Sequence, residues 1–257
     1  MKRFLVIITS LIFSLSAIAN QKEIVIAADP WCPWNCDSQD KPGIAVDLVK
    51  IIFEPYGYKI KYEIMPWERA IKLVAQGEIT AIIGASPNDA DTKNFIYPTT
   101  YLNYSNNVYT IRSDSNFVLT DGKSLQKKMI GVVAGYHFQS MLGSYIDIHY
   151  NDKKIIDLAY GKNAPQQNIE KLINNKIDIY VDDAYVIQYN AYLLDVTQKI
   201  RVGGSLNEDT GSYIGFSPTF AESKKLANIY DKEFAKIKKN GLYKKILSKY
   251  GIYEFRD

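Results

Sequence analysis

The only two cysteines of the chain, Cys32 and Cys36, are separated by three residues in the segment Trp31-Cys-Pro-Trp-Asn-Cys36. In an oxidising compartment, an even pair this close most simply forms a disulfide. Redox-active pairs usually have two intervening residues, and a metal site needs more ligands than this loop and the two histidines of the chain offer. The alternative that both cysteines are free thiols stays open. A disulfide here would rigidify the tryptophan-bearing loop without joining distant parts of the chain.

The N-terminus has the order of residues typical of a secretory signal peptide. Lys2 and Arg3 precede a largely apolar stretch over residues 4–15, and Ala17-Ile-Ala19 supplies a small-x-small cleavage site. The apolar stretch is too short to span a bilayer, which argues against a membrane anchor. No cysteine follows the cleavage site, so a lipoprotein anchor is not expected. We predict cleavage after Ala19 and a free, periplasmic mature protein.

The net charge of the mature chain bears on which partners it could bind. Without residues 1–19 the chain has 238 residues, with 29 basic and 28 acidic side chains. A charge so close to neutral gives no reason to expect nucleic acid or an anionic membrane as a partner. The length suits one large domain or two lobes of about 100 residues each.

Strands and helices alternate along the first part of the chain. The expected elements are strand 24–28, a buried helix that Gly43 opens and Gly57 closes, strand 58–64, helix 66–77 and strand 79–84. This order predicts a mostly parallel sheet with helices on both faces. A second unit repeats the pattern, with strand 129–133, helix 136–145, strand 146–150, helix 166–175, strand 177–181 and a helix through Leu194.

Two extended stretches, Asn107–Arg112 and Ser212–Ser217, flank the second unit, and two helices end the chain. They predict an α/β protein of two lobes joined by a two-strand hinge, an architecture that suits closure around a ligand. The expected division is residues 20–110 for the first part of lobe 1, 111–211 for lobe 2, and 212–257 for the return to lobe 1.

Short motifs in a characteristic order carry a resemblance that covers residues 22–252. They are Ile24–Asp29, Gly43–Leu48, Ala75–Ile79, Tyr97–Tyr101, Gly131–Tyr136, Leu172–Asp178 and Asn240–Tyr250. With these motifs the chain resembles the family 3 solute-binding proteins, which include glutamine- and histidine-binding components of bacterial ABC importers. The resemblance implies a type II periplasmic-binding-protein fold, a ligand cleft between the lobes, a permease partner, a monomer and no cofactor.

The family's usual carboxylate clamp is replaced in this chain. The resemblance implies an Arg just after the third strand, in a motif like S-x-T-x-x-R, where its guanidinium would hold the ligand carboxylate by two parallel hydrogen bonds. Ser86 matches this motif, but Asp91 stands where the Arg is expected. That carboxylate would repel an anionic ligand head unless Lys93 or another cation takes over.

Arg69 is one candidate replacement, at the start of the helix that follows Pro66. The resemblance places Trp67 on the cleft wall. Two residues along a helix correspond to about 200°, so ideal geometry would not put Trp67 and Arg69 on one face. A surface or salt-bridge role for Arg69 is therefore the alternative.

The resemblance is closer in the second lobe. It places Asp183 where the family accepts hydrogen bonds from a ligand ammonium, while Asp182 is expected to cap the next helix. Gly135, Tyr136 and His137 match a helix-start loop whose backbone N–H groups usually hold a carboxylate oxygen. His137 itself is more typical of a capping or surface residue.

Aromatic and acidic residues complete the predicted site. The resemblance puts all three tryptophans near the cleft, namely Trp31, Trp34 and Trp67, although at least one is expected to pack in a core. Stacking a cation on such rings contributes ~0.5 to 2 kcal/mol per contact. Three acidic residues are expected nearby, namely Asp29, Asp91 and Asp183. Their negative charge favours a ligand with a positive centre. An amino-acid zwitterion remains possible if Arg69 or Lys93 points inward.

Three functions are compatible with this sequence. The first is delivery of a bound solute to an ABC importer. The second is an enzyme on the same scaffold, since the family includes periplasmic dehydratases of cyclic acids, for which Glu68 or Asp183 would be the candidate acid or base. The third is a receptor that presents its liganded form to a membrane sensor. The first and third use the same closing motion, so the sequence does not separate them.

Overall fold

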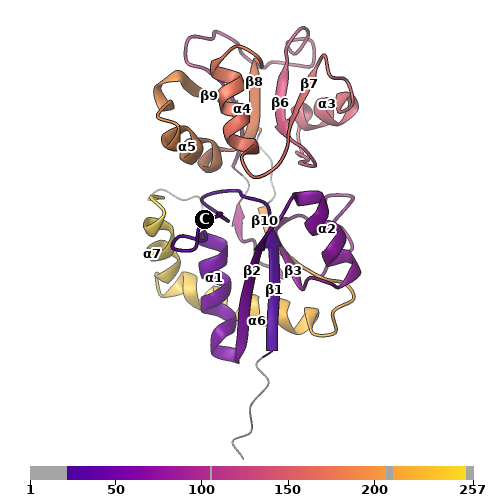
Figure 1. Cartoon of the computed structure of the whole chain (residues 1–257), viewed down its shortest axis with the longest axis vertical. Helices are drawn as coiled ribbons and strands as arrows, with labels where there is room; N and C mark the ends of the chain where they lie inside the picture. The colour runs from indigo at the N-terminus through magenta and orange to yellow at the C-terminus, as the bar shows by residue number, and fades with distance from the viewer. Residues whose placement is uncertain (1–21, 105, 207–210, 253–257) are drawn as a thin grey trace, which may run out of the picture.

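The computed structural model describes residues 22–104, 106–206 and 211–252, so the predicted signal peptide lies outside the described residues. Two five-stranded sheets, each with its own helices, form two lobes that lie end to end (Figure 1). Within the described ranges, no helix is long and apolar enough to cross a membrane.

Lobe 1 contains a mixed sheet with the strand order β2-β1-β3-β10-β4. Its strands are β1 (Lys22–Ala28), β2 (Tyr58–Ile64), β3 (Ala81–Ala85), β4 (Asn103–Tyr104) and β10 (Gly211–Phe216). Strand β1 is parallel to β2 and β3, whereas β10 is antiparallel to β3 and β4. Half of the pairings are therefore antiparallel, because β10 enters the sheet after the chain has returned from lobe 2.

The helices of lobe 1 cover both faces of this sheet. They are α1 (Ile44–Phe53), α2 (Trp67–Gln76), α6 (Ser223–Lys239) and α7 (Leu242–Lys249), with a short 3-10 helix at Glu54–Tyr56. Successive side chains of a strand point to opposite faces. Accordingly, Ile24 and Ile26 of β1 pack in the core formed with α1, α6 and α7, and Val25 and Ala27 pack against α2.

Lobe 2 is built in the same way, with the strand order β7-β6-β8-β5-β9. Its strands are β5 (Asn107–Arg112), β6 (Ile130–Val133), β7 (Ile156–Ala159), β8 (Ile179–Asp183) and β9 (Ile200–Ser205). Its helices are α3 (Met141–His149), α4 (Ala164–Ile173) and α5 (Ala184–Leu193), with a 3-10 turn at Thr197–Lys199. Val181 of β8 packs with Leu142 of α3 on one face, and Tyr180 packs with Ile169 of α4 on the other.

The chain passes between the sheets twice, once between β4 and β5 and once between β9 and β10 (Figure 1). The two stretches that the sequence predicted as extended crossings are β5 and β10, and each belongs to one sheet. The predicted two-lobe α/β fold is confirmed. The described residues that flank the two crossings are paired with each other, since the Leu206 N–H donates to the Asn107 carbonyl at 2.9 Å and Gly211 pairs with Tyr104. Two adjacent crossings are the arrangement that hinge closure requires.

One local prediction was wrong. The sequence favoured a helix over residues 136–145 and a strand over 146–150, but the structure has a single helix, α3, that continues through this region, and places β7 later. The side chain of Ser140 accepts a hydrogen bond from a backbone N–H of the first turn of α3 and so fixes where the helix begins. Leu142 and Ile146, four residues apart, are both buried on one helix face.

Candidate functional site

The loop that follows β1 is closed by a disulfide between Cys32 and Cys36, whose Cα atoms are 4.8 Å apart. This is the simplest of the alternatives that the spacing left open. The Trp31 backbone N–H donates to the Asn35 carbonyl at 2.7 Å, and the Trp34 N–H donates to the Trp31 carbonyl at 2.9 Å. The loop is therefore a compact turn that presents two tryptophans in fixed positions.

This loop also covers the N-terminus of α1. The first N–H groups of a helix have no partner within the helix. Here the N–H groups of Ile44 and Ala45 donate to the carbonyls of Pro33 and Trp34, each at 2.9 Å. Gly43 makes this approach possible, because it has φ 116° and a Cβ at this position would lie only 2.4 Å from the Trp34 carbonyl oxygen.

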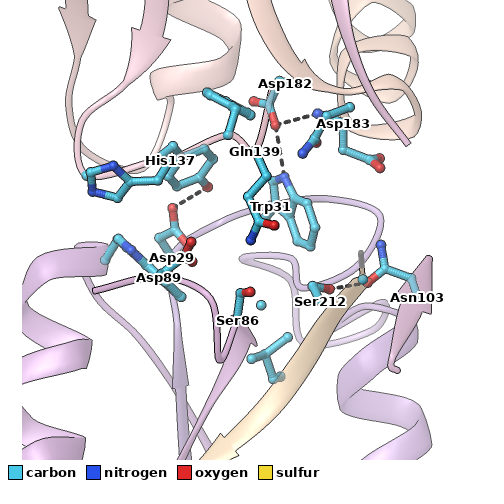
Figure 2. Close-up of a pocket in the computed structure, with 18 residues that line it drawn as sticks. Asp29, Trp31, Ser86, Asp89, Asn103, His137, Gln139, Asp182, Asp183 and Ser212 are labelled. Atoms are coloured by element: carbon cyan, nitrogen blue, oxygen red, sulfur yellow. Dashed lines mark hydrogen bonds between the residues drawn. The ribbon is translucent and has the colours of Figure 1, made fainter. Parts of the chain in front are cut away.

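Both indoles of the loop reach across to lobe 2. Trp31 Nε1 donates to Asp182 Oδ1 at 3.1 Å, and Trp34 Nε1 donates to Asp183 Oδ1 at 3.2 Å. Figure 2 shows the Trp31 contact below the two aspartates. A third contact between the lobes joins the Tyr136 hydroxyl to Asp29 Oδ2 at 2.7 Å. In each case an N–H or O–H group donates to a carboxylate of the opposite lobe.

Asp183, at the end of β8, caps the following helix. Its Oδ1 accepts hydrogen bonds from the N–H groups of Tyr185 and Val186 at 3.0 and 3.2 Å. The prediction that Asp182 would be the cap was therefore wrong: Asp182 instead accepts from the Tyr180 hydroxyl at 2.5 Å and from the Asp183 N–H at 2.8 Å. Asp183 Oδ2 is buried without a hydrogen-bond partner.

The three carboxyl groups at the lobe boundary have raised pKa values. Burial removes water from the charged form and raises the pKa of Asp29 to about 6, that of Asp182 to about 6 and that of Asp183 to about 7. Donors from Tyr136, Tyr180 and the two tryptophans oppose this effect without cancelling it. The boundary is thus a site where negative charge is costly.

A cavity of about 100 Å³ lies between the lobes (Figure 2). Seven of the residues predicted from the sequence line it, namely Asp29, Trp31, Trp67, Ser86, Tyr136, His137 and Asp183. Lobe 1 supplies the first four and lobe 2 the other three. The Trp67 and Tyr136 rings, one from each lobe, meet edge to face with centroids 6.3 Å apart.

Other predicted residues lie elsewhere. Trp34 has 0% of its surface exposed and packs in the core of lobe 1. Arg69 is exposed on α2 and does not line the cavity. Asp91 and Lys93 are also exposed outside the cavity, so neither contributes its charge to the lining. Neither candidate replacement for the missing Arg, Arg69 or Lys93, is therefore among the described lining residues.

The expectation that Gly135, Tyr136 and His137 begin a helix was wrong, because α3 begins only at Met141. The Gly135 N–H donates to the Tyr150 hydroxyl at 2.8 Å, and the Tyr136 N–H donates to the Val133 carbonyl at 3.1 Å. Both donors are thus already used within lobe 2.

The sequence analysis missed several lining residues, namely Asp89, Asn103, Gln139, Asp182 and Ser212. Gln139 reaches across the boundary, where its Oε1 accepts from Asn88 Nδ2 at 3.3 Å. Their positions in loops and beside the crossings follow no spacing rule, although Asp182 was signalled by its place next to Asp183. In the described part of the chain, no group of three His, Cys, Asp or Glu residues is placed to hold a metal ion.

Two α/β lobes with a cavity lined from both sides define a two-lobe binding protein. The chain belongs to the bacterial extracellular solute-binding proteins, family 3, whose family model matches residues 24–252. The family predicted from the sequence is therefore confirmed. A search of curated proteins gave no match.

Solved structures share the fold at low sequence identity. A protein of Streptococcus mutans, from work on glutathione import via GshT and the cystine ABC importer TcyBC, is 17% identical with a TM-score of 0.74, covering 92% of this chain and 98% of that chain. A substrate-binding protein of an ABC uptake transporter from Streptococcus pneumoniae, with bound histidine, is 20% identical with a TM-score of 0.70, covering 89% and 92%. A histidine kinase sensor domain similar to periplasmic binding proteins is 16% identical with a TM-score of 0.73, covering 91% and 99%.

Proposed function

We propose that the protein is a periplasmic solute-binding protein that captures a small polar molecule by closure of its lobes and delivers it to an inner-membrane ABC importer. The observation that carries this proposal is the cavity lined by side chains of both lobes. A ligand that contacts both walls interacts more strongly with the closed form than with an open one, and so shifts the population toward closure.

Three further features support export. The family is extracellular, the N-terminal residues have the order of a signal peptide, and the Cys32–Cys36 disulfide suits an oxidising compartment. The near-neutral charge of the mature chain gives no reason to expect nucleic acid as a partner, and we propose that the protein acts as a monomer. The sheet of lobe 2 begins at Asn107 of β5 and ends at Ser205 of β9, so we propose that lobe 2 is the segment between the two crossings.

Binding without catalysis is the favoured activity. An enzyme of the cyclic acid dehydratase type needs a carboxylate clamp as well as an acid or base. The described lining residues include no arginine or lysine that could form such a clamp. The carboxyl groups of Asp182 and Asp183 accept hydrogen bonds from indoles and backbone groups, which gives them a role in holding the lobes together.

A receptor that signals to a membrane sensor is the second candidate. It is favoured by the likeness in fold to a histidine kinase sensor domain over 91% of this chain. Both candidates use the same closure of the lobes, and they differ in the protein that recognises the closed form. A permease gene next to the gene for this chain would favour import.

A thermal-shift screen of the purified mature protein tests the binding function. The panel contains amino acids, opines, polyamines and small carboxylates. A ligand at 100 times its dissociation constant stabilises the folded form by about 2.7 kcal/mol, which raises the melting temperature measurably. A panel with no stabilising compound would contradict the proposal, and turnover of a bound cyclic acid would establish the enzyme instead.

A further inference from the structure

The charges that line the cavity are of one sign. Four aspartates line it, namely Asp29, Asp89, Asp182 and Asp183, and the described lining residues include no arginine or lysine. The single histidine of the lining, His137, places its Nδ1 3.0 Å from Asp147 Oδ1, outside the lining. The cavity therefore attracts positive charge and repels negative charge.

Four backbone donors at or beside the cavity are already bonded, two in the loop after β6 and two at the start of α5. The N–H groups of Gly135 and Tyr136 have partners within lobe 2. At the N-terminus of α5, the positive end of the helix dipole, the Asp183 side chain accepts from the two N–H groups of the first turn. A ligand carboxylate would have to compete with these contacts and with the surrounding aspartates.

The buried carboxyl groups have no cationic partner in the described chain. Asp29, Asp182 and Asp183 are at most 9% exposed and form no ion pair with a lysine, arginine or histidine among the described residues. Asp183 Oδ2 additionally lacks any hydrogen-bond partner. Burying a charge without a partner costs free energy, and a cation in the cavity would offset that cost.

Among the three buried carboxyl groups of the lining, Asp29 is the most open to a ligand. It retains 9% exposure, whereas Asp182 and Asp183 have 1% each and are covered by the indoles of Trp31 and Trp34. The Tyr136 hydroxyl donates to the Asp29 carboxylate and so holds it in place, and both residues line the cavity. Figure 2 labels Asp29 and marks this hydrogen bond with a dashed line.

Aromatic rings add a second kind of attraction for cations. The Trp31, Trp67 and Tyr136 rings line the same cavity. The face of an aromatic ring attracts a cation, most strongly where water is excluded. Acidic and aromatic groups from both lobes thus favour the same kind of ligand.

We propose that the cleft binds a small organic cation that has no carboxylate group, such as a primary amine or a guanidine, with Asp29 as the carboxylate that neutralises its charge. The proposal rests on the solute-binding function proposed above and names the class of solute. An amino acid differs from its decarboxylated amine by the carboxylate, a group for which the described lining residues include no arginine or lysine as a partner.

Calorimetric titration with matched pairs tests this choice. The pairs are arginine with agmatine, lysine with cadaverine and histidine with histamine, each titrated into the purified mature protein at pH 7.5. In at least one pair we expect the amine to bind at least tenfold more tightly than its amino acid. An amino acid that binds as tightly as its amine would overturn the inference while leaving the solute-binding function intact.

Two variants test whether Asp29 is the carboxylate that neutralises the charge of the ligand. Asp29→Asn removes the charge and keeps the shape, and it should weaken amine binding at least tenfold. Asp91→Asn removes an exposed aspartate of the same lobe outside the cavity and should leave the affinity unchanged. Equal affinities for Asp29→Asn and the unchanged protein would overturn the role of Asp29.

A measurement on the unchanged protein covers the case in which Asp29→Asn does not fold. At pH 6 a bound cation favours the ionised carboxylate, so binding should release protons, and the measured enthalpy should depend on the ionisation enthalpy of the buffer. An enthalpy independent of the buffer would contradict the inference. If only neutral or acidic compounds of the screen bind, the ligand class fails alone, whereas no binding by any compound contradicts both proposals.

Discussion

The two walls of the cleft differ in both structure and chemistry. Lobe 2 presents carboxyl groups fixed at the end of strand β8, within regular structure. Lobe 1 presents rings on a disulfide-closed loop and at the start of α2. The aspartates of lobe 2 are buried because the rings of lobe 1 cover them and donate to them. Closure of the lobes therefore buries these carboxyl groups at the same time.

The Trp34→Ala substitution removes a ring of the lobe 1 loop, and we expect it to have the largest effect on the free energy of unfolding. The side chain is fully buried in the core of lobe 1 and its indole donates to Asp183. Removing a buried tryptophan typically costs about 3 to 5 kcal/mol of unfolding free energy. Urea denaturation measures this loss. The control Tyr192→Ala removes a ring that is 74% exposed, for which we expect a change of no more than about 0.5 kcal/mol.

Lowering the pH tests the lobe 2 wall. The pKa of Asp183 is about 7 in the folded chain, against an ordinary 3.8, so the folded chain binds its proton more readily than the unfolded chain. Its contribution to stability is full below pH 3.8 and is lost as the pH rises through about 7. Asp29 and Asp182, each with a pKa of about 6, act in the same direction.

We therefore expect the ligand-free protein to be about 1 to 3 kcal/mol more stable at pH 5 than at pH 8. Urea denaturation at both pH values measures the difference. Asp183→Asn keeps an oxygen that can cap α5 and accept from Trp34, and it should reduce the pH dependence. A protein that is more stable at pH 8 than at pH 5 would show that other groups dominate.

Arg69→Ala should have the smallest effect on ligand affinity. This variant tests whether Arg69 belongs to the lobe 1 side of the cavity. The side chain is exposed on α2, on the helix that carries the cavity residue Trp67. We expect ligand affinity to change by less than about twofold, which corresponds to about 0.4 kcal/mol. A tenfold loss of affinity in calorimetry would restore Arg69 as a ligand residue.

The sequence predicted the regular elements well where periodicity is clear. The apolar runs of β1 and α1 were assigned close to their observed bounds, because alternate residues of β1 face two cores and one stripe of α1 is buried. The region of α3 was misassigned because Ile146 and Ile148 alternate with polar residues as in a strand, although Ile148 is 79% exposed. Only the position of the Ser140 cap resolves that ambiguity.

Site residues could be predicted from the sequence where they lie at the end of a strand. Asp29 follows β1 and Asp183 ends β8, so the order of elements brings both to the cleft. Gln139, Asn103 and Ser212 could not be found in this way, because they reach the cavity from loops or from short strands beside the crossings. Trp34 was expected near the cleft, and only packing reveals that its ring fills the core while its N–H reaches Asp183.

The positions of the three tryptophans give the protein a built-in optical signal. Trp31 and Trp34 lie with ring centroids 6.2 Å apart, and both donate across the boundary between the lobes. Trp67 meets Tyr136 of the other lobe. Separation of the lobes removes the two indole hydrogen bonds and the Trp67–Tyr136 contact, and so changes the surroundings of all three indoles. Intrinsic fluorescence therefore follows opening and closing directly, without an attached dye.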